Sequence, residues 1–149
     1  MSISIGVSDV LSILAIIVSI ASAMFQWYFD KRMNKINLES EYFSSLYLEH
    51  LLHKLPMARN RLNFSNNRLI DFDALVDELN LIRRDSLYFK YVDTDFYSRA
   101  KFKLQSLEDY LINLSEKKLN SNEQKEAFKQ IEVMLESIYK IFSDKYIGN

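Results

Sequence analysis

The hydrophobic pattern opens with a run of twenty uncharged residues from Val10 to Phe29, and ten of the twenty are Val, Leu, Ile or Phe. As an α-helix rising about 1.5 Å per residue, such a run is roughly 30 Å long, which matches the hydrocarbon core of a bilayer. The pattern therefore predicts a transmembrane helix over residues 10–29.

The charges on either side of this run predict its orientation in the membrane. All nineteen Lys and Arg residues lie at position 31 or later. Three of them form a basic juxtamembrane anchor directly after the run: Lys31, Arg32 and Lys35. Trp27 and Tyr28 lie where amphipathic rings prefer the lipid headgroups. The positive-inside rule then leaves residues 1–9 as a short extracytoplasmic N-terminus of a single-pass cell-membrane protein, with the C-terminal part in the cytoplasm.

Two other interpretations of the run stay open. The tripeptide Ala21-Ser22-Ala23 has the small-x-small form of a signal-peptide cleavage site, although no basic residue precedes the apolar run. The run is also compatible with a buried helix of a soluble core, although twenty uncharged residues leave that helix no polar face for solvent.

Small and polar residues recur within the run at alternating spacings of three and four. They predict one stripe along the helix, formed by Ser12, Ala15, Ser19, Ser22 and Gln26. In lipid, helices associate through close backbone approach and interhelical hydrogen bonds, which such a stripe permits. The sequence leaves open whether the stripe mediates self-association or is a tolerated lipid-facing surface.

After the run the pattern becomes amphipathic with a helical period. Residues 30–40 are expected to extend the first helix as a basic juxtamembrane segment, and residues 41–149 to form a cytoplasmic bundle of about four helices. With 2 Gly and 1 Pro in the chain, the fold class is predicted to be all-α. Two stripes of coiled-coil type predict an antiparallel helix hairpin. Their members are Ala100, Leu104, Leu107, Leu111 and Leu114, and then Phe128, Ile131, Leu135, Ile138 and Phe142.

Polar residues and Pro56 mark the expected ends of these helices. Pro56 predicts a kink or break just before it, because proline removes a backbone donor and clashes with the preceding turn. The segment 63–67 is predicted to be a loop, since Asn and Ser compete with helical hydrogen bonds. The expected helix starts are Asp71, the polar break at residues 92–95, and a capping box of Ser121 with Gln124.

The sequence carries no recognisable catalytic chemistry. There is no Cys, and two Gly leave no room for a glycine-rich phosphate loop. His50 and His53 lie one helical turn apart, but a metal would need further ligands such as Glu49, and the alternative is a partly exposed helix face. We therefore predict no enzyme activity, no catalytic or metal-binding residues, and no cofactor.

Charge is distributed unevenly along the chain. Residues 30–70 contain seven basic and four acidic residues, whereas residues 71–149 contain twelve basic and fifteen acidic residues. The candidate phosphate-contacting residues in the basic part are Arg59, Arg61 and Arg68. They could face anionic lipid headgroups, nucleic acid or nucleotide phosphate, or simply solvent.

The predicted function is a membrane-anchored, non-enzymatic helical interaction module that binds a cytoplasmic protein or a second copy of itself. An alternative is a membrane-disrupting or pore-forming effector, because in layout alone the chain resembles the small anchored effectors of bacterial antiphage and toxin systems. A third possibility is a membrane-tethered accessory subunit that senses nucleic acid or nucleotide. The expected partners are the lipid bilayer and a protein, while nucleic acid and a small-molecule substrate are not expected.

Overall fold

The structure is a computed structural model that describes the backbone of residues 7–147 and the side chains of residues 16–147 other than residue 35. The described chain is mostly helical. It divides into two compact units, Met1–Tyr42 and Phe43–Asn149. Residues 1–6 of the predicted extracytoplasmic segment 1–9 lie outside the described residues.

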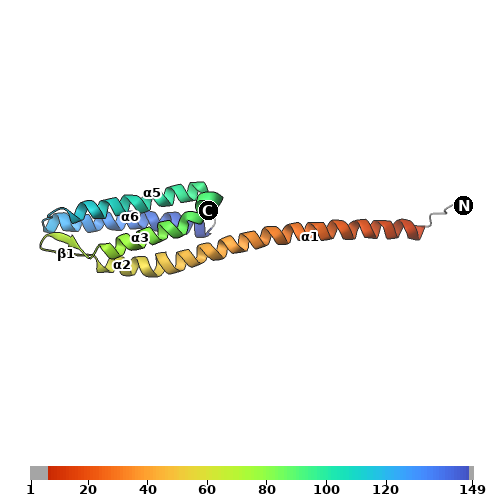
Figure 1. Cartoon of the computed structure of the whole chain (residues 1–149), viewed down its shortest axis with the longest axis horizontal. Helices are drawn as coiled ribbons and strands as arrows, with labels where there is room; N and C mark the ends of the chain where they lie inside the picture. The colour runs from red at the N-terminus through yellow and green to blue at the C-terminus, as the bar shows by residue number, and fades with distance from the viewer. Residues whose placement is uncertain (1–6, 148–149) are drawn as a thin grey trace. The chain divides into compact units, whose positions relative to one another are not determined.

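The first unit consists of most of helix α1, which runs without a break from Val7 to Leu46 (Figure 1). Its described large apolar side chains are exposed, and they are Ile16, Ile17, Val18, Ile20, Met24, Phe25, Trp27, Tyr28, Phe29, Met33, Ile36, Leu38 and Tyr42. A single helix offers these side chains no surface against which to become buried. Four of them, at positions 16, 17, 18 and 20, spread over about half of the helix circumference.

Among the residues that the structure describes, none of the helices combines the length and the apolar character needed to cross a membrane. This finding does not support the transmembrane helix expected over residues 10–29. The described side chains begin at Ile16 and the charges Asp30 and Lys31 follow Phe29, so fourteen residues of the run are described with their side chains. A span requires about 20 residues, and the side chains of residues 10–15 lie outside the described part.

The second unit is a helical bundle, so the predicted all-α bundle of about four helices is confirmed (Figure 1). The first helix of the bundle is a continuous segment in which η1 is followed directly by α2. The other three helices of the bundle are α3, α5 and α6. The bounds are Tyr47–Lys54 for η1, Leu55–Arg61 for α2, Asp73–Asp85 for α3, Thr94–Ser115 for α5 and Ser121–Ile147 for α6. Two short segments, η2 (Ser86–Tyr88) and α4 (Phe89–Val92), join α3 to α5.

Helices α5 and α6 form the predicted antiparallel hairpin and lie side by side in Figure 1. All five residues of the first predicted stripe are buried on α5. Four residues of the second stripe are buried on α6, and Phe128 is half-buried against the core. Lys145 near the end of α6 donates a hydrogen bond to Asp93 before α5 over 2.8 Å, which fixes the antiparallel direction.

An aromatic cluster closes the end of the bundle where Phe43 enters it. Phe43, Phe89 and Phe96 meet edge to face, with ring centroids 5.2 to 5.6 Å apart. Phe142 of α6 completes the cluster at 5.2 Å from Phe96. Edge-to-face contact directs the positive ring edge at the negative ring face, which adds to the gain from apolar burial.

The segment predicted to be a loop, residues 63–67, instead forms most of a small β-hairpin. Strand β1 (Asn63–Ser65) pairs antiparallel with β2 (Arg68–Ile70), and Phe64 lies opposite Leu69. Asn66 and Asn67 both have positive φ, at 50° and 66°. A two-residue turn of type I′ needs positive φ at both central positions, and Asn tolerates this conformation better than most residues. The same asparagines that indicated a loop therefore close a hairpin.

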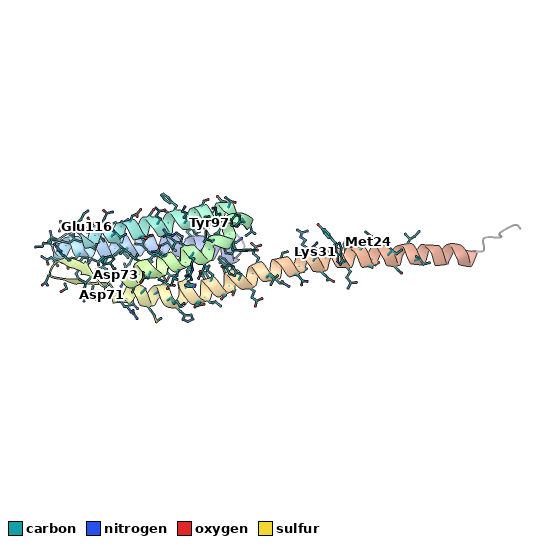
Figure 2. The ribbon with its side chains drawn as sticks, in the orientation of Figure 1. Met24, Lys31, Asp71, Asp73, Tyr97 and Glu116 are labelled. Atoms are coloured by element: carbon teal, nitrogen blue, oxygen red, sulfur yellow. The ribbon has the colours of Figure 1, made fainter. Side chains whose placement is uncertain are left out.

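Two predicted helix caps are wrong by one residue, since Phe72 and Asn120 take the places predicted for Asp71 and Ser121. Asp71 has a φ of 56°, in the left-handed region, and α3 begins at Asp73 (Figure 2). At α6 the capping box is formed by Asn120 and Glu123, because Asn120 Oδ1 accepts from the amide of Glu123 and Glu123 Oε2 accepts from that of Asn120. The cap predicted in the break at residues 92–95 is confirmed, since Asp93 Oδ1 accepts a hydrogen bond from the amide of Phe96.

Candidate functional site

The residues of the predicted membrane stripe that the structure describes, Ser19, Ser22 and Gln26, are exposed on α1. Ser12 and Ala15 lie outside the described side chains, as does Lys35 of the juxtamembrane anchor. The other two anchor residues, Lys31 and Arg32, are exposed. Lys31 (Figure 2) places its Nζ 5.3 Å from the ring centroid of Trp27, within the range of a cation–π interaction.

The three candidate phosphate-contacting arginines lie on different parts of the second unit. Arg59 forms an ion pair with Glu132 of α6 at 2.7 Å and lies over the ring of Phe128. Arg61 lines a separate surface hollow with Asp71 and Asp73. Arg68 is exposed on β2. Carboxylates therefore accompany Arg59 and Arg61.

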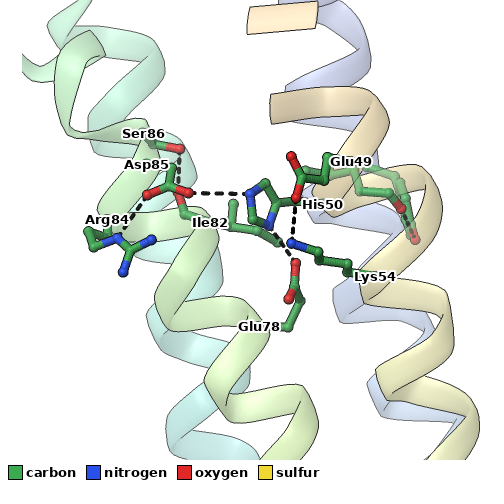
Figure 3. Close-up of polar contacts among 10 residues, drawn as sticks. Glu49, His50, Lys54, Glu78, Ile82, Arg84, Asp85 and Ser86 are labelled. Atoms are coloured by element: carbon green, nitrogen blue, oxygen red, sulfur yellow. Dashed lines mark hydrogen bonds and ion pairs between the residues drawn. The ribbon is translucent and has the colours of Figure 1, made fainter. Parts of the chain in front are cut away.

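The strongest polar arrangement in the described part of the chain is a buried cluster between η1 and α3. His50 of η1 lies with its imidazole ring between two carboxylates of α3 (Figure 3). Its Nδ1 is 2.7 Å from Glu78 Oε1, and its Nε2 is 3.3 Å from Asp85 Oδ2. The side chains of His50 and Glu78 are 8% and 7% exposed. We call His50, Glu78 and Asp85 the histidine cluster.

His50 reaches α3 because η1 is a π-helix rather than an α-helix. The wider turn places the neighbouring residues His50 and Leu51 both in the bundle interior, where both are buried. In this segment the amide of Leu55 donates to the carbonyl of His50, five residues earlier. Segments of π-helix are rare, and they occur often at functional sites.

Pro56 explains how this π-helix is completed. The next i+5 donor, to the carbonyl of Leu51, would be Pro56, which has no amide hydrogen. Tyr139 of α6 takes its place, because its hydroxyl donates to Leu51 O over 2.8 Å. The break expected at Pro56 is therefore a change of helix type from η1 to α2, and the chain stays helical across it.

The surroundings of the histidine cluster are also charged. Glu49 and Lys54 of η1 form an ion pair of 2.6 Å, and Arg84 pairs with Asp85 at 2.8 Å (Figure 3). The hydrogen bond from Lys54 lowers the pKa of Glu49, and Lys54 and His50 act in the same direction through charge. The hydrogen bond to Glu49 likewise raises the pKa of Lys54, and the charges of Glu78 and Asp85 add to that rise.

Burial limits the chemistry of this cluster. A general base must come within hydrogen-bond reach of a substrate proton, whereas His50 is surrounded by side chains of η1 and α3. Within the described residues there is no group of three or more His, Cys, Asp or Glu side chains arranged to hold a metal ion. The geometry therefore favours a role in holding η1 against α3.

A groove between α2 and α6, with a volume of about 370 Å³, lies close to the same segment. Its lining combines apolar surface with charged residues, and consists of Pro56, Arg59, Asn60, Glu132, Leu135, Glu136 and Tyr139. Burial raises the pKa of Tyr139, and the neighbouring Tyr47 adds to the rise. Tyr139 therefore stays a hydrogen-bond donor at neutral pH.

Sequence reasoning missed the histidine cluster, since it placed His50 and His53 together on a partly exposed face. His53 is exposed, but His50 is buried. One signal was present in α3, where Glu78 lies three residues after Leu75 and four before Ile82, on the apolar face of the helix. A carboxylate at such a position needs a buried partner.

Comparison with known proteins finds no match, since no protein-family model, no curated protein and no solved structure is significantly similar to the chain.

Proposed function

We propose that this chain is a membrane-anchored, non-enzymatic interaction module, in which the N-terminal part of α1 inserts into a bilayer and the bundle binds a protein partner or a second copy. The observation that carries the proposal is the run of twenty uncharged residues between Asp9 and Asp30. The described part of the run has exposed large apolar side chains over most of the helix circumference, and Ser19, Ser22 and Gln26 lie on the remaining side. Such a broad apolar surface is satisfied by apolar surroundings, and lipid provides them.

The proposed membrane span includes residues whose side chains the structure does not describe. From Ile16 onward the run has fourteen residues, whereas from Val10 it has twenty, which is the length of a membrane span. Residues 10–15 contribute Val10, Leu11, Ile13 and Leu14 to the run. The anchoring function therefore depends on this N-terminal third of the run.

The orientation follows from the residues after the run. Trp27, Lys31 and Arg32 suit the headgroup region of a leaflet, and the positive-inside rule assigns that leaflet to the cytoplasm. The bundle is then a cytoplasmic module. Its groove between α2 and α6 is lined by the apolar residues Pro56 and Leu135 together with carboxylates, and it is a candidate surface for a partner.

The experiment compares two arginine substitutions on the same helix. Ile20→Arg puts a charge at the centre of the run, where an arginine costs about 3 kcal/mol of insertion free energy. Leu38→Arg is the matched control, because Leu38 is also an exposed apolar residue of α1 but follows the basic residues. Each full-length chain is expressed in cells, and the share that stays in membranes after an alkaline wash is measured.

The proposal predicts that the wild-type chain and Leu38→Arg stay in the membrane fraction and that Ile20→Arg moves largely into the soluble fraction. Protease added to sealed, intact cells should leave the bundle undigested. A wild-type chain that is released by the wash would contradict the proposed anchor. Digestion of the bundle from outside intact cells would contradict the orientation.

A further inference from the structure

The hydrogen-bond donors and acceptors in the histidine cluster limit the protonation state that His50 can have. A neutral imidazole has one N–H donor and one acceptor nitrogen, whereas an ionised carboxylate only accepts. Both ring nitrogens of His50 lie against carboxylate oxygens, Nδ1 against Glu78 and Nε2 against Asp85. Both contacts are attractive only when both nitrogens carry hydrogen, as they do in the imidazolium.

The charges around the cluster also favour a protonated His50. Three carboxylates gather at this side of the bundle, those of Glu49, Glu78 and Asp85, and two permanent cations pair with them, Lys54 and Arg84. An imidazolium at His50 makes the charges equal. A neutral His50 leaves one negative charge in excess around a side chain that is almost fully buried, which is unfavourable at low dielectric.

We propose that His50 is held as an imidazolium between Glu78 and Asp85 and acts as a proton-dependent latch that fastens η1 to α3. Loss of its proton would turn a nitrogen lone pair toward a carboxylate, so that one contact becomes repulsive. The latch lies next to the point where α1 enters the bundle, since η1 follows α1 directly. Release of the latch would therefore loosen the first helix of the bundle.

The titratable groups on each neighbouring element are compatible with this latch. On η1 itself Glu49 and Lys54 pair with each other, and His53 is exposed. On α3, Glu78 and Asp85 face the ring, and Arg84 binds Asp85. On α6, Tyr139 is engaged with Leu51 O. On α2, Arg59 pairs with Glu132 of α6. Histidine is the side-chain type whose charge changes near neutral pH.

The sign of the pH effect follows from linkage. Under the proposal, the folded protein holds the proton of His50 more tightly than the unfolded chain does. The folded state is then most stable at pH values where His50 is protonated. The stability then falls as the pH rises through the range in which the folded protein releases that proton. The latch therefore predicts a bundle that loosens in mild base and tightens in mild acid.

Nitrogen-15 NMR of the histidine rings in the full-length chain tests the protonation state directly. His53 is the internal control, because it is exposed and follows His50 by three residues. The proposal predicts that at pH values where His53 has become neutral, both ring nitrogens of His50 still show the shifts of a protonated imidazolium. A His50 ring with one protonated and one bare nitrogen there, with the proton resting on Glu78 or Asp85, overturns the proposal.

The second test measures the thermal midpoint of the bundle from about pH 6 to about pH 8, the range around the ordinary titration of histidine. The wild-type chain should lose about 5 °C over this range, the shift expected from a modest stability change in a domain of this size. His50→Gln should be less stable but nearly independent of pH, while His53→Gln should behave like the wild type. An unchanged pH dependence in His50→Gln contradicts the latch.

Glu78→Gln keeps the proposal testable if His50→Gln fails to fold. This variant keeps the side-chain size but removes one of the two carboxylates that stabilise the imidazolium. The proposal predicts that His50 in Glu78→Gln loses its proton at a lower pH than in the wild type. No change in the His50 titration would show that Glu78 does not hold the charge.

Discussion

Helices α1 and α6 are both rich in apolar residues, but they distribute them differently. On α6 the apolar side chains Ile131, Leu135, Ile138 and Phe142 recur at helical spacing and are buried in the bundle. On α1, Ile16, Ile17, Val18 and Ile20 are nearly consecutive, and each is more than half exposed. The first pattern packs against a neighbour on one side, whereas the second is broader than one such contact face.

The contrast separates two sources of helix stability. A helix such as α6 gains its stability by packing its apolar stripe against other helices of the same chain. In the segment of α1 from Ile16 to Phe29 the large apolar side chains are exposed, and burial in a bilayer is what we propose for them. The variants below test this contrast in order of decreasing expected effect.

The largest effect is expected in the buried stripe of α5. Leu107→Ala removes a fully buried side chain and should lower the free energy of unfolding by about 2 to 5 kcal/mol, through lost transfer free energy and the cavity left behind. Thermal unfolding followed by circular dichroism measures the loss. Ile20→Ala is the control on α1 and should change the stability of the bundle by less than about 0.5 kcal/mol. An equal loss of unfolding free energy in the two variants would contradict the proposed difference between the bundle and the first part of α1.

An intermediate effect is expected at the hydrogen bond that completes η1. Tyr139→Phe leaves the carbonyl of Leu51 without its side-chain donor, which should cost about 1 to 2 kcal/mol. Tyr110→Phe is the control, because Tyr110 is also half-buried but has no hydrogen bond within the described part of the chain. Urea denaturation of both variants compares them, and an equal effect would mean that the bond to Leu51 does not stabilise η1.

A smaller effect is expected at the start of α5. Partial burial opposes the ionisation of Asp93, but hydrogen bonds from Lys145 and from the amide of Phe96 outweigh it and lower its pKa. Ionised Asp93 therefore adds stability that is present above its ordinary pKa of 3.8 and is lost as the pH falls through the lowered value.

Asp93→Asn keeps a capping oxygen but removes the charge, so we expect a loss of about 0.5 to 1 kcal/mol at neutral pH, limited by solvent screening. The loss should shrink in acid, where wild-type Asp93 becomes neutral. The exposed Asp95, which pairs with Arg99 on the same helix turn, supplies the control Asp95→Asn. Acid titration of the unfolding free energy should show the larger pH-dependent difference for Asp93→Asn.

Regular periodicity made the bundle predictable from sequence. The stripes of α5 and α6 were located correctly because burial on one face imposes a fixed spacing on apolar residues. The cap at Ser121 was misplaced because the adjacent Asn120 also has a suitable oxygen, whereas the N-cap position of α3 is Phe72, which makes no side-chain cap hydrogen bond. The hairpin was missed because paired asparagines indicate both a loop and a turn with positive φ.

The histidine cluster was not predictable from the spacing of histidines alone. An α-helical period puts His50 beside His53, whereas the π-helical turn of η1 directs His50 inward to α3. The partners Glu78 and Asp85 are 28 and 35 positions further along the chain, so only the tertiary fold brings them to the ring.

The central claim, that α1 inserts into lipid, can be tested through the one tryptophan of the chain. Trp27 is 67% exposed on α1, near the end of the uncharged run. The full-length chain is reconstituted into vesicles whose lipids carry bromine at defined depths, and Trp27 fluorescence is recorded. Insertion predicts a blue-shifted emission that shallow bromines quench more strongly than deep ones or aqueous iodide. An emission like that of tryptophan in water, quenched by iodide and untouched by brominated lipid, would contradict the account.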